Sequence, residues 1–336
     1  MKILHITPHM GGGVGTVIMG WMEKVTTHND YNHQVFCMDF INIKVDVWAD
    51  QTGFPLYCTT ISFLKDEIEQ ADIVLVHYWD HPKLAELFSQ PIPDCRMVFW
   101  CHQNFPVPQN ELNYPDLFLD VSPVQGHGRH IWSTGGVNRF LAIQPKEHKG
   151  FNVGYVGTVD WKKIHPRFLD MCNDIMEDIP NVRFIIVGTN HLIDTQKPFY
   201  GNLGKKLIFT GQVDDVAPYL AEMDVFGYPL RPDHYGTSEQ VLGEAMAAGV
   251  VPVVMDNHAE RLIIRERFDE GYVANTPEKY IQLITALSAG SAGRSVVARN
   301  ARNRAKILYS LDTMIRKWDE VFTEMMKQPK RKRNKP

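Results

Sequence analysis

The residues best suited to chemistry lie between Gly227 and Asn257, in the segment GYPLRPDHYGTSEQVLGEAMAAGVVPVVMDN. An apolar run ends at Pro229, a loop rich in Gly, Thr and Ser follows, and Glu244 stands two turns into an amphipathic helix before a Val-rich strand. Backbone N–H groups at the start of a helix favour anions, because the helix dipole is positive there. A carboxylate can accept hydrogen bonds from both hydroxyls of a vicinal diol. The segment therefore predicts an anion-binding loop followed by a hydroxyl-binding carboxylate.

A second glycine-rich segment, GGGVG at residues 11–15, directly follows the first predicted strand. Glycine permits tight turns and a close backbone approach, and the helix beyond it presents N–H groups to phosphate, so Gly12 and Gly13 are candidate phosphate-binding residues. The spacing is compressed relative to G-x-G-x-x-G, and a plain strand-to-helix turn is the alternative. Because Asp39 ends the next strand, a nicotinamide-dependent oxidoreductase also stays open from this half alone.

Short apolar strands alternate with helical patterns along the chain, which predicts an α/β fold made of parallel βαβ units. The predicted strands are 2–7, 33–39, 56–60, 73–77, 97–102, 117–122, 151–156, 181–187, 206–210, 225–228 and 250–255. The predicted helices are 15–25, 63–70, 83–88, 167–177, 216–223, 239–248, 276–289 and 311–327.

The polar segment QPKEHKG at residues 144–150 interrupts this alternation, and a chain of 336 residues is long for one core. We therefore expect two Rossmann-like domains, residues 1–147 and 148–310, with a cleft between them as the expected site. The last ten residues carry six positive charges, which predicts a basic disordered tail at 328–336. A nucleic-acid or anionic-membrane contact is the alternative role of this tail.

Composition narrows the functional classes. Five scattered cysteines without a C-x-x-C pair predict neither a disulfide framework nor a zinc site, and they fit a reduced, cytoplasmic setting. No stretch approaches about 18 uninterrupted apolar residues, so we expect no membrane-spanning segment. Histidines do not cluster with carboxylates at a metal-ligand spacing, and no suitable D-x-D sequence occurs, so no metal is predicted. Walker A and G-x-S-x-G sequences are absent.

The second half reads GYVGTVDWKKIHPRF, NVRFIIVG, LIFTGQVDDVAPYLAEMDVFGYPL and HYGTSEQVLGEAMAAGVVPVV in that order. This order resembles the donor domain of the retaining glycosyltransferases of family 4, also called group 1, which have the GT-B architecture. The resemblance covers residues 151–265 and extends more weakly over 1–125. It implies two Rossmann-like domains facing a central cleft, with the helix at 311–327 crossing back to the first domain.

The resemblance also assigns residues to a nucleotide-sugar donor. It places Lys163 on the diphosphate, where a fixed cation stabilises the departing charge, and Glu244 on the ribose hydroxyls. Thr158 stands where the family has an arginine, and Arg231 is a candidate replacement for that cation. Further donor-binding positions implied by the resemblance are Gly12, Gly13, Gly157, Thr158, Gly211, Val213, Gly236, Thr237 and Ser238.

The chain departs from the family at the first glutamate of its E-x7-E segment. Glu244 matches the second glutamate, but Gly236 occupies the first position, and Glu239 lies three residues further on. Two readings stay open for Glu239: it takes over the missing contact to the sugar hydroxyls, or it caps its own helix with help from Thr237 or Ser238. The backbone N–H groups of residues 236–238 are candidate phosphate donors under either reading.

His102 follows the strand MVFWC, where an equivalent histidine of the family approaches the donor sugar, and His77 is a lesser candidate. Together with Lys163 and Glu239, His102 completes the predicted catalytic set. The implied activity is the transfer of a sugar from a nucleoside-diphosphate sugar to an acceptor hydroxyl with retention of configuration. No cofactor and no metal are expected.

The acceptor stays open between a small molecule, a glycan, a protein and a nucleic acid. Since Thr158 and Gly236 replace two usual donor contacts, a nucleotide-sugar-binding protein without transfer activity is one alternative. A sugar-nucleotide epimerase on the same fold is the other.

Overall fold

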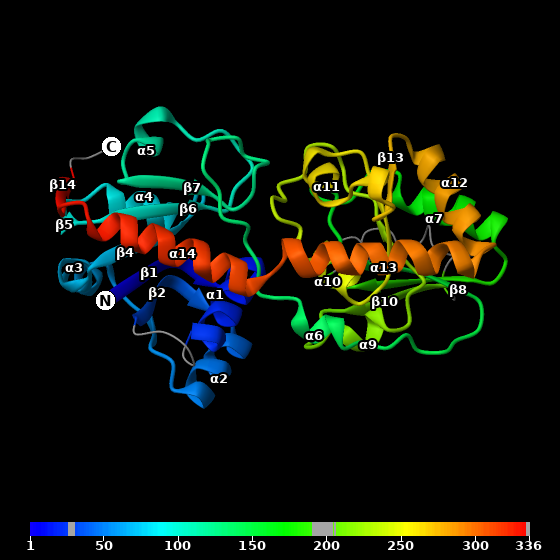
Figure 1. Ribbon diagram of the computed structural model, residues 1–336, viewed down its shortest axis with the longest axis horizontal. Helices are drawn as coiled ribbons and strands as arrows, with labels where there is room; N and C mark the ends of the chain where they lie inside the picture. The colour runs from blue at the N-terminus through cyan, green and yellow to red at the C-terminus, as the bar shows by residue number, and fades with distance from the viewer. Residues whose placement is uncertain (26–30, 190–203, 205, 334–336) are drawn as a thin grey trace. The chain divides into compact units, whose positions relative to one another are not determined.

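The computed structural model describes residues 1–25, 31–189, 204 and 206–333 (Figure 1). The chain divides into two compact units. Unit 1 comprises Met1–Gly136 together with Leu311–Pro336, and unit 2 comprises Val137–Ser310. The boundary falls before the polar segment in which the sequence analysis placed it, and the C-terminal segment is part of unit 1.

Unit 1 is built on a six-stranded parallel sheet with the strand order β3-β2-β1-β4-β6-β7 (Figure 1). Its strands are β1 (Lys2–Met10), β2 (Asn32–Ile41), β3 (Leu56–Cys58), β4 (Ile73–Tyr78), β6 (Met97–Cys101) and β7 (Leu117–Asp120). The order reverses between β1 and β4, as in Rossmann folds, and ligands of such sheets bind beyond the carboxyl ends of the strands at this reversal.

Helices cover both faces of this sheet. They are α1 (Gly12–Val25), α2 (Ile43–Thr52), α3 (Ile61–Gln70), α4 (Pro82–Phe88), α5 (Gln109–Leu112) and α14 (Leu311–Met326). One face is covered by α1 and α14, because Trp21, Trp318 and Phe322 of these helices lie in the same apolar cluster as Ile3 and Leu75 of the sheet. Segments from opposite ends of the chain thus share one core.

Unit 2 repeats the same strand order with a second six-stranded parallel sheet, β10-β9-β8-β11-β12-β13. Its strands are β8 (Phe151–Val156), β9 (Val182–Val187), β10 (Leu207–Gly211), β11 (Val225–Tyr228), β12 (Val251–Met255) and β13 (Tyr272–Ala274). Its helices are α6 (Asn138–Leu141), α7 (Phe168–Asp178), α9 (Ala217–Leu220), α10 (Gln240–Ala247), α11 (His258–Ile263), the 3₁₀ helix η2 (Glu266–Phe268), α12 (Pro277–Ser288) and α13 (Ser291–Leu308). The reversal lies between β8 and β11.

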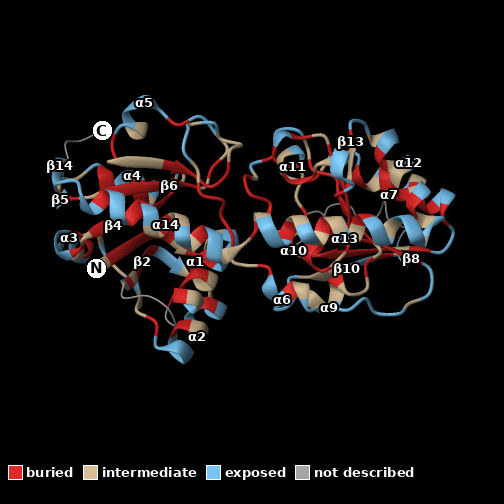
Figure 2. Ribbon diagram, in the orientation of Figure 1, coloured by how far each residue is buried: buried red, intermediate tan, exposed pale blue. Residues whose placement is uncertain are grey.

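The central strands are buried throughout, whereas the helices alternate buried and exposed positions (Figure 2). Every residue of β4, β6, β8, β11 and β12 is buried. Continuous apolar runs are what a parallel sheet covered on both faces requires. The predicted α/β fold with two Rossmann-like units is confirmed.

Several elements were not predicted from the sequence, among them α2, α11 and β13, and two differences concern the C-terminal part of the chain. The helix α13 was not predicted, because alanines at positions 301 and 305 carry its buried side beside many charged residues, which makes its apolar pattern weak. The tail predicted to be disordered contains the strand β14 (Arg331–Arg333), which pairs antiparallel with β5 (Ile92–Cys95). Arg331 also pairs with Asp116 and so ties the tail to unit 1. The last three residues of the predicted tail, 334–336, lie outside the described residues.

Among the described residues, none of the helices has both the length and the apolar character needed to cross a membrane.

Candidate active site

The candidate site of unit 2 lies at the carboxyl ends of β8 and β11, the two strands between which the strand order reverses. Gly157 follows β8 with a φ of 143°, a backbone conformation that favours glycine. A Cβ atom on Gly188, at the end of neighbouring β9, would lie 2.0 Å from the carbonyl oxygen of Gly157. The two glycines therefore let the strand ends approach each other closely where Rossmann sheets bind ligands.

A buried ion pair is the centre of this site. The Nζ atom of Lys163 lies 3.4 Å from Oε2 of Glu239, and the side chains are 12% and 2% exposed. The hydroxyl of Tyr228, the last residue of β11, donates a hydrogen bond to the same carboxylate oxygen. Burial by itself would raise the pKa of Glu239, but the charges of Lys163 and His234 and the Tyr228 hydrogen bond outweigh it and lower the pKa. Glu239 is therefore ionised in its pair with Lys163.

The backbone places the Glu239 carboxylate where the side chain of residue 236 would otherwise be. A Cβ atom on Gly236 would lie 1.5 Å from Oε1 of Glu239, so glycine is required there as long as Glu239 keeps this position. Glu239 has a φ of 38°, in the left-handed region that non-glycine residues rarely adopt. Such strain persists only where the surroundings impose it, and it is common at functional sites.

Glu239 does not cap its helix. It stands at the N-cap position of α10, but its side chain makes no capping hydrogen bond, so the capping interpretation of Glu239 was wrong. Its backbone is held instead by Tyr309, whose hydroxyl donates to the carbonyl oxygens of Ser238 and Glu239 at 2.7 and 3.0 Å. The ring of Tyr309 packs so closely on α10 that a Cβ on Gly243 would lie 2.4 Å from it.

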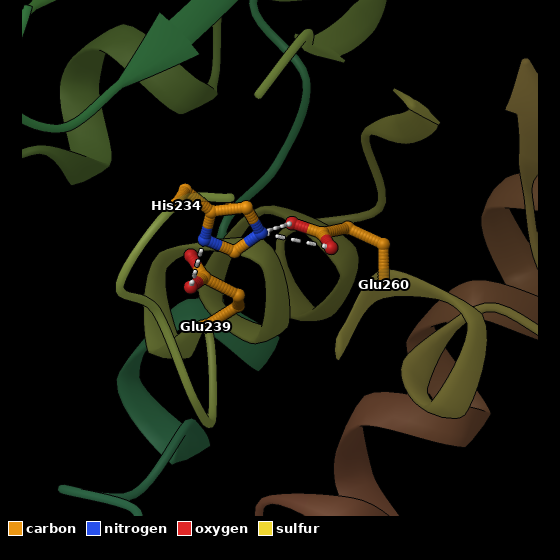
Figure 3. A group of neighbouring side chains, drawn as sticks. All are labelled: His234, Glu239 and Glu260. Carbon is orange, nitrogen blue, oxygen red and sulfur yellow. Dashed lines mark hydrogen bonds and ion pairs between the residues drawn. The ribbon is translucent and has the colours of Figure 1, made fainter. Parts of the chain in front are cut away.

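A second carboxylate extends the network through a histidine. The ring of His234 lies between Glu239 and Glu260, and each carboxylate faces a different ring nitrogen (Figure 3). Nε2 lies 3.3 Å from Glu260, and Nδ1 lies 3.8 Å from Glu239. The N–H of Gly236 donates to Nδ1 at 3.0 Å, and Nε2 faces Glu260 as its hydrogen-bond donor. Burial opposes a charged ring, but the hydrogen bond to Glu260 and the charges of both carboxylates outweigh it and raise the pKa of His234.

Among the described residues, His234, Glu239 and Glu260 each offer one ligand atom, and these three atoms lie within 4.8 Å of one another, close enough to hold a metal ion. Glu239 is already paired with Lys163 and Tyr228, however, and Nδ1 of His234 accepts from the N–H of Gly236. The contacts of these three residues are those of a hydrogen-bonded network and not of a metal coordination shell. The N–H of Gly236, predicted as a phosphate donor, is also already engaged by His234.

Glu244 has a different environment from Glu239. It lies half-buried on α10, and burial raises its pKa to about 7, with Arg139 lowering it and Asp215 raising it. Arg139 of α6 and Asp215 themselves lie 3.9 Å apart. A carboxylate with a pKa near 7 lacks a strong partner, and hydroxyl groups of a ligand would supply the hydrogen bonds that stabilise its charge.

Arg231 makes contacts other than those predicted for it. Arg231, the candidate replacement for the cation missing at Thr158, pairs with Asp233 through Nε and Nη2 and donates from Nη1 to the carbonyl oxygen of Trp161 at 2.8 Å. Its own N–H donates to the carbonyl of Lys163 at 3.0 Å. Arg231 therefore holds the Lys163 loop in place, and Asp233 balances its charge.

The remaining predicted positions of unit 2 lie at strand ends. Tyr155 donates from its hydroxyl to the carbonyl oxygen of Thr158 at 2.9 Å, which fixes the turn after β8. Gly211 ends β10 with a φ of 73°, and its carbonyl accepts from the N–H of Gly188 at 2.9 Å. Val213, two residues beyond, is partly exposed.

In unit 1 the predicted residues lie at the carboxyl edge of its own sheet. Gly12 begins α1 with a φ of 55°, and Gly13 follows it, so the glycines do form a turn from β1 into a helix N-terminus. His102 directly follows β6, and its Nε2 lies 3.1 Å from Nδ1 of His77. A pocket of about 300 Å³ opens beyond the end of β4, lined among others by Tyr78 and Trp79.

Comparisons with known proteins show which protein class the chain resembles. Residues 150–290 match the family model described as Glycosyl transferases group 1. No curated protein matches the chain. HepE from Anabaena, solved with UDP, shares 14% identity at a TM-score of 0.75, covering 96% of this chain and 100% of HepE.

Two further solved structures share the fold. TarM matches at 10% identity with a TM-score of 0.78, over 96% of this chain and 99% of TarM. Sucrose-phosphate synthase from Thermosynechococcus elongatus matches at 15% identity with a TM-score of 0.70, over 97% of this chain and 100% of the synthase. The resemblance to group 1 glycosyltransferases is thereby confirmed for residues 150–290, and the fold is the GT-B fold of these enzymes.

Four residues that hold Glu239 in place were not predicted from the sequence: Tyr228, His234, Glu260 and Tyr309. Tyr228 was visible as the polar end of an apolar strand, and His234 as a histidine two residues before the glycine loop. Glu260 and Tyr309 come from later segments that no local pattern connects with the loop.

Proposed function

We propose that this protein is a glycosyltransferase that moves a sugar from a nucleoside-diphosphate sugar to an acceptor hydroxyl, with retention of configuration and without a metal. The observation that carries the proposal is the buried Lys163–Glu239 pair at the strand-order reversal of a unit that matches the group 1 family. HepE was solved with UDP and with UDP-glucose, which makes uridine nucleotides the first donors to test.

The residues take the following roles in this proposal. Lys163 is the cation for the diphosphate: its ammonium group is fixed by Glu239 before the ligand arrives, so little reorganisation is needed when negative charge develops on the leaving group. Backbone N–H groups of Thr237 and Ser238, just before the N-terminus of α10, are proposed to add to this positive potential. Glu244 accepts hydrogen bonds from the ribose hydroxyls.

Glu239 is proposed to take the place of the glutamate missing at position 236. Its carboxylate already occupies the space next to the Gly236 Cα, so a carboxylate reaches the family position from a different point of the chain. The free oxygen lone pairs of this carboxylate are then available to hydroxyls of the donor sugar.

Thermal unfolding in the presence of nucleotides tests the donor site. UDP or UDP-glucose at 100 times its dissociation constant should stabilise the protein by about 2.7 kcal/mol. The shift should disappear in Glu244→Ala and persist in Glu177→Ala, a control at an exposed glutamate on α7. The absence of a shift with any uridine, guanosine or adenosine diphosphate sugar would refute the donor site.

Turnover separates transfer from binding alone. Release of nucleoside diphosphate that depends on an added acceptor, with an α-linked product from an α-linked donor, is the expected result. Saturable donor binding without product, or isomerised donor without acceptor, would instead establish a binding protein or an epimerase.

A further inference from the structure

Four histidines, of which His5, His33 and His77 are buried and His102 is half-buried, form a continuous hydrogen-bonded array across the sheet of unit 1. Nδ1 of His33 lies 2.9 Å from Nε2 of His5, Nδ1 of His5 lies 3.2 Å from Nε2 of His77, and Nδ1 of His77 lies 3.1 Å from Nε2 of His102. Each contact therefore joins Nδ1 of one ring to Nε2 of the next, in the same sense at every step.

The sheet register explains why the array is regular. His33 lies on β2 opposite Ile3, and His5 lies two residues further along β1. His5 is level with Leu75 on β4, so His77 is again two residues further. On β6 the residue level with His77 is Trp100, and His102 is two residues beyond it. Steps of two residues keep all four side chains on one face of the sheet and carry the array to its carboxyl edge.

Aromatic side chains separate the array from water on that face. The ring of Trp21 lies 5.1 Å from His5 and 5.7 Å from His33, and that of Phe322 lies 6.2 Å from His33. Burial lowers the pKa of each of the four histidines, so all four rings are neutral at pH 7. Each ring then has one N–H and one acceptor nitrogen.

A neutral array of this kind has two consistent arrangements of its protons. In the first, every Nδ1–H donates to the next Nε2, so His102 carries its proton on Nδ1. In the second, every Nε2–H donates in the opposite direction, and His33 is left with a buried Nε2–H. Nε2 of His33 has no hydrogen-bond partner among the described residues. Orphaned buried donors are rarer in proteins than under-satisfied acceptors, which favours the first arrangement.

We propose that His5, His33 and His77 are positioning residues that hold His102 as the Nδ1–H tautomer, so that a neutral His102 donates a hydrogen bond to an oxygen of the bound sugar substrate. The tautomer follows from the array alone. The substrate contact rests on the proposed function.

Long-range ¹H–¹⁵N correlation spectra of histidine-labelled protein at pH 7 test the tautomer, with the His102 signals assigned through His102→Gln. The expected spectrum has a protonated Nδ1 and an unprotonated Nε2 at His102. A protonated Nε2 at His102 in the wild type would overturn the proposal without any further variant.

Two substitutions at His77 provide a matched pair. The amide of asparagine is attached at Cγ, as Nδ1 is, so His77→Asn can still donate to Nε2 of His102. The amide of glutamine is one bond further out, as Nε2 is, so His77→Gln keeps the contact to His5 and loses the one to His102. His77→Asn should therefore preserve the Nδ1–H tautomer of His102, whereas His77→Gln should no longer hold His102 in that tautomer. Equal spectra in the two variants would contradict the array.

Calorimetric binding of UDP-glucose and UDP addresses the substrate contact. The sugar-dependent part of the affinity should fall about 2- to 10-fold in His77→Gln, the worth of one neutral hydrogen bond, and stay unchanged in His77→Asn. If His77→Gln changes the His102 tautomer but not the affinity for UDP-glucose, the proposed substrate contact is wrong and the histidine array still holds. If neither ligand binds the wild type, the proposed function fails, whereas the tautomer measurement still decides the array.

Discussion

The neutral histidine array makes the stability of unit 1 sensitive to acid, and His33 is the residue at which this can be measured. Burial, together with the charge of the N-terminal amino group, lowers the pKa of His33 to about 4, against an ordinary value of 6.5. The folded state therefore binds fewer protons than the unfolded state between pH 6.5 and pH 4. The stability is fully present above pH 6.5 and is lost as the pH falls through this window.

The magnitude follows from the two pKa values. At pH 5 the unfolded ring is almost fully protonated, and the folded ring is only about one-tenth protonated. Lowering the pH from 7 to 5 should cost about 2 kcal/mol through His33 alone. For a unit of this size, that corresponds to a fall in Tm of about 4–8 °C.

The perturbation is His33→Asn, which removes the titrating ring and keeps an amide near the position of Nδ1. Tryptophan fluorescence is a suitable assay, because six of the seven tryptophans belong to unit 1: Trp21, Trp48, Trp79, Trp100, Trp132 and Trp318. The loss of Tm between pH 7 and pH 5 should be smaller in His33→Asn by the amount given above. His258→Asn, at an exposed histidine of unit 2, should behave as the wild type. An identical pH dependence of the wild type and His33→Asn would refute the reasoning.

Three further predictions concern unit 2. Lys163→Met should destabilise it by about 3–5 kcal/mol, because Glu239 stays buried without its cation; urea unfolding should show that adding Glu239→Gln recovers part of this loss, and purely additive effects would contradict the ion pair. Gly236→Ala should displace the Glu239 carboxylate and abolish the thermal shift with nucleotide, since the new Cβ would overlap Oε1; an unchanged shift would show that Glu239 does not hold the donor. Tyr309→Phe should cost about 1–3 kcal/mol in urea unfolding, because the Ser238 carbonyl loses the Tyr309 hydroxyl and the Glu239 carbonyl keeps only its helical N–H donors; a loss near zero would mean that the left-handed backbone of Glu239 needs no such support.

The strand pattern of the protein was largely readable from its sequence. Continuous apolar runs such as IVLVH and MVFWC can only be satisfied between two layers of helices, so they predicted buried parallel strands that the structure confirms. The helix α13 was not predicted because its buried side consists mainly of small residues. The strand β14 was not predicted because its charged segment has no strand pattern.

The sequence by itself determined which residue types stand at the strand ends. Lys163 follows one predicted strand, and the glycine loop with Glu239 follows another. Residues that follow parallel strands lie at the carboxyl edge of the sheet. The histidines after KIL, IVLV and MVFWC were visible as single polar residues in or after apolar strands.

Only the tertiary structure decided how these residues interact. The Glu239 carboxylate reaches the space beside Gly236 because Tyr228, His234 and the more distant Tyr309 hold it there. The four histidines become one array because the strand order β2-β1-β4-β6 brings together segments that are up to 97 residues apart in the chain, from His5 to His102. Pairing order and register are set by the packing of the whole sheet, and no local pattern contains them.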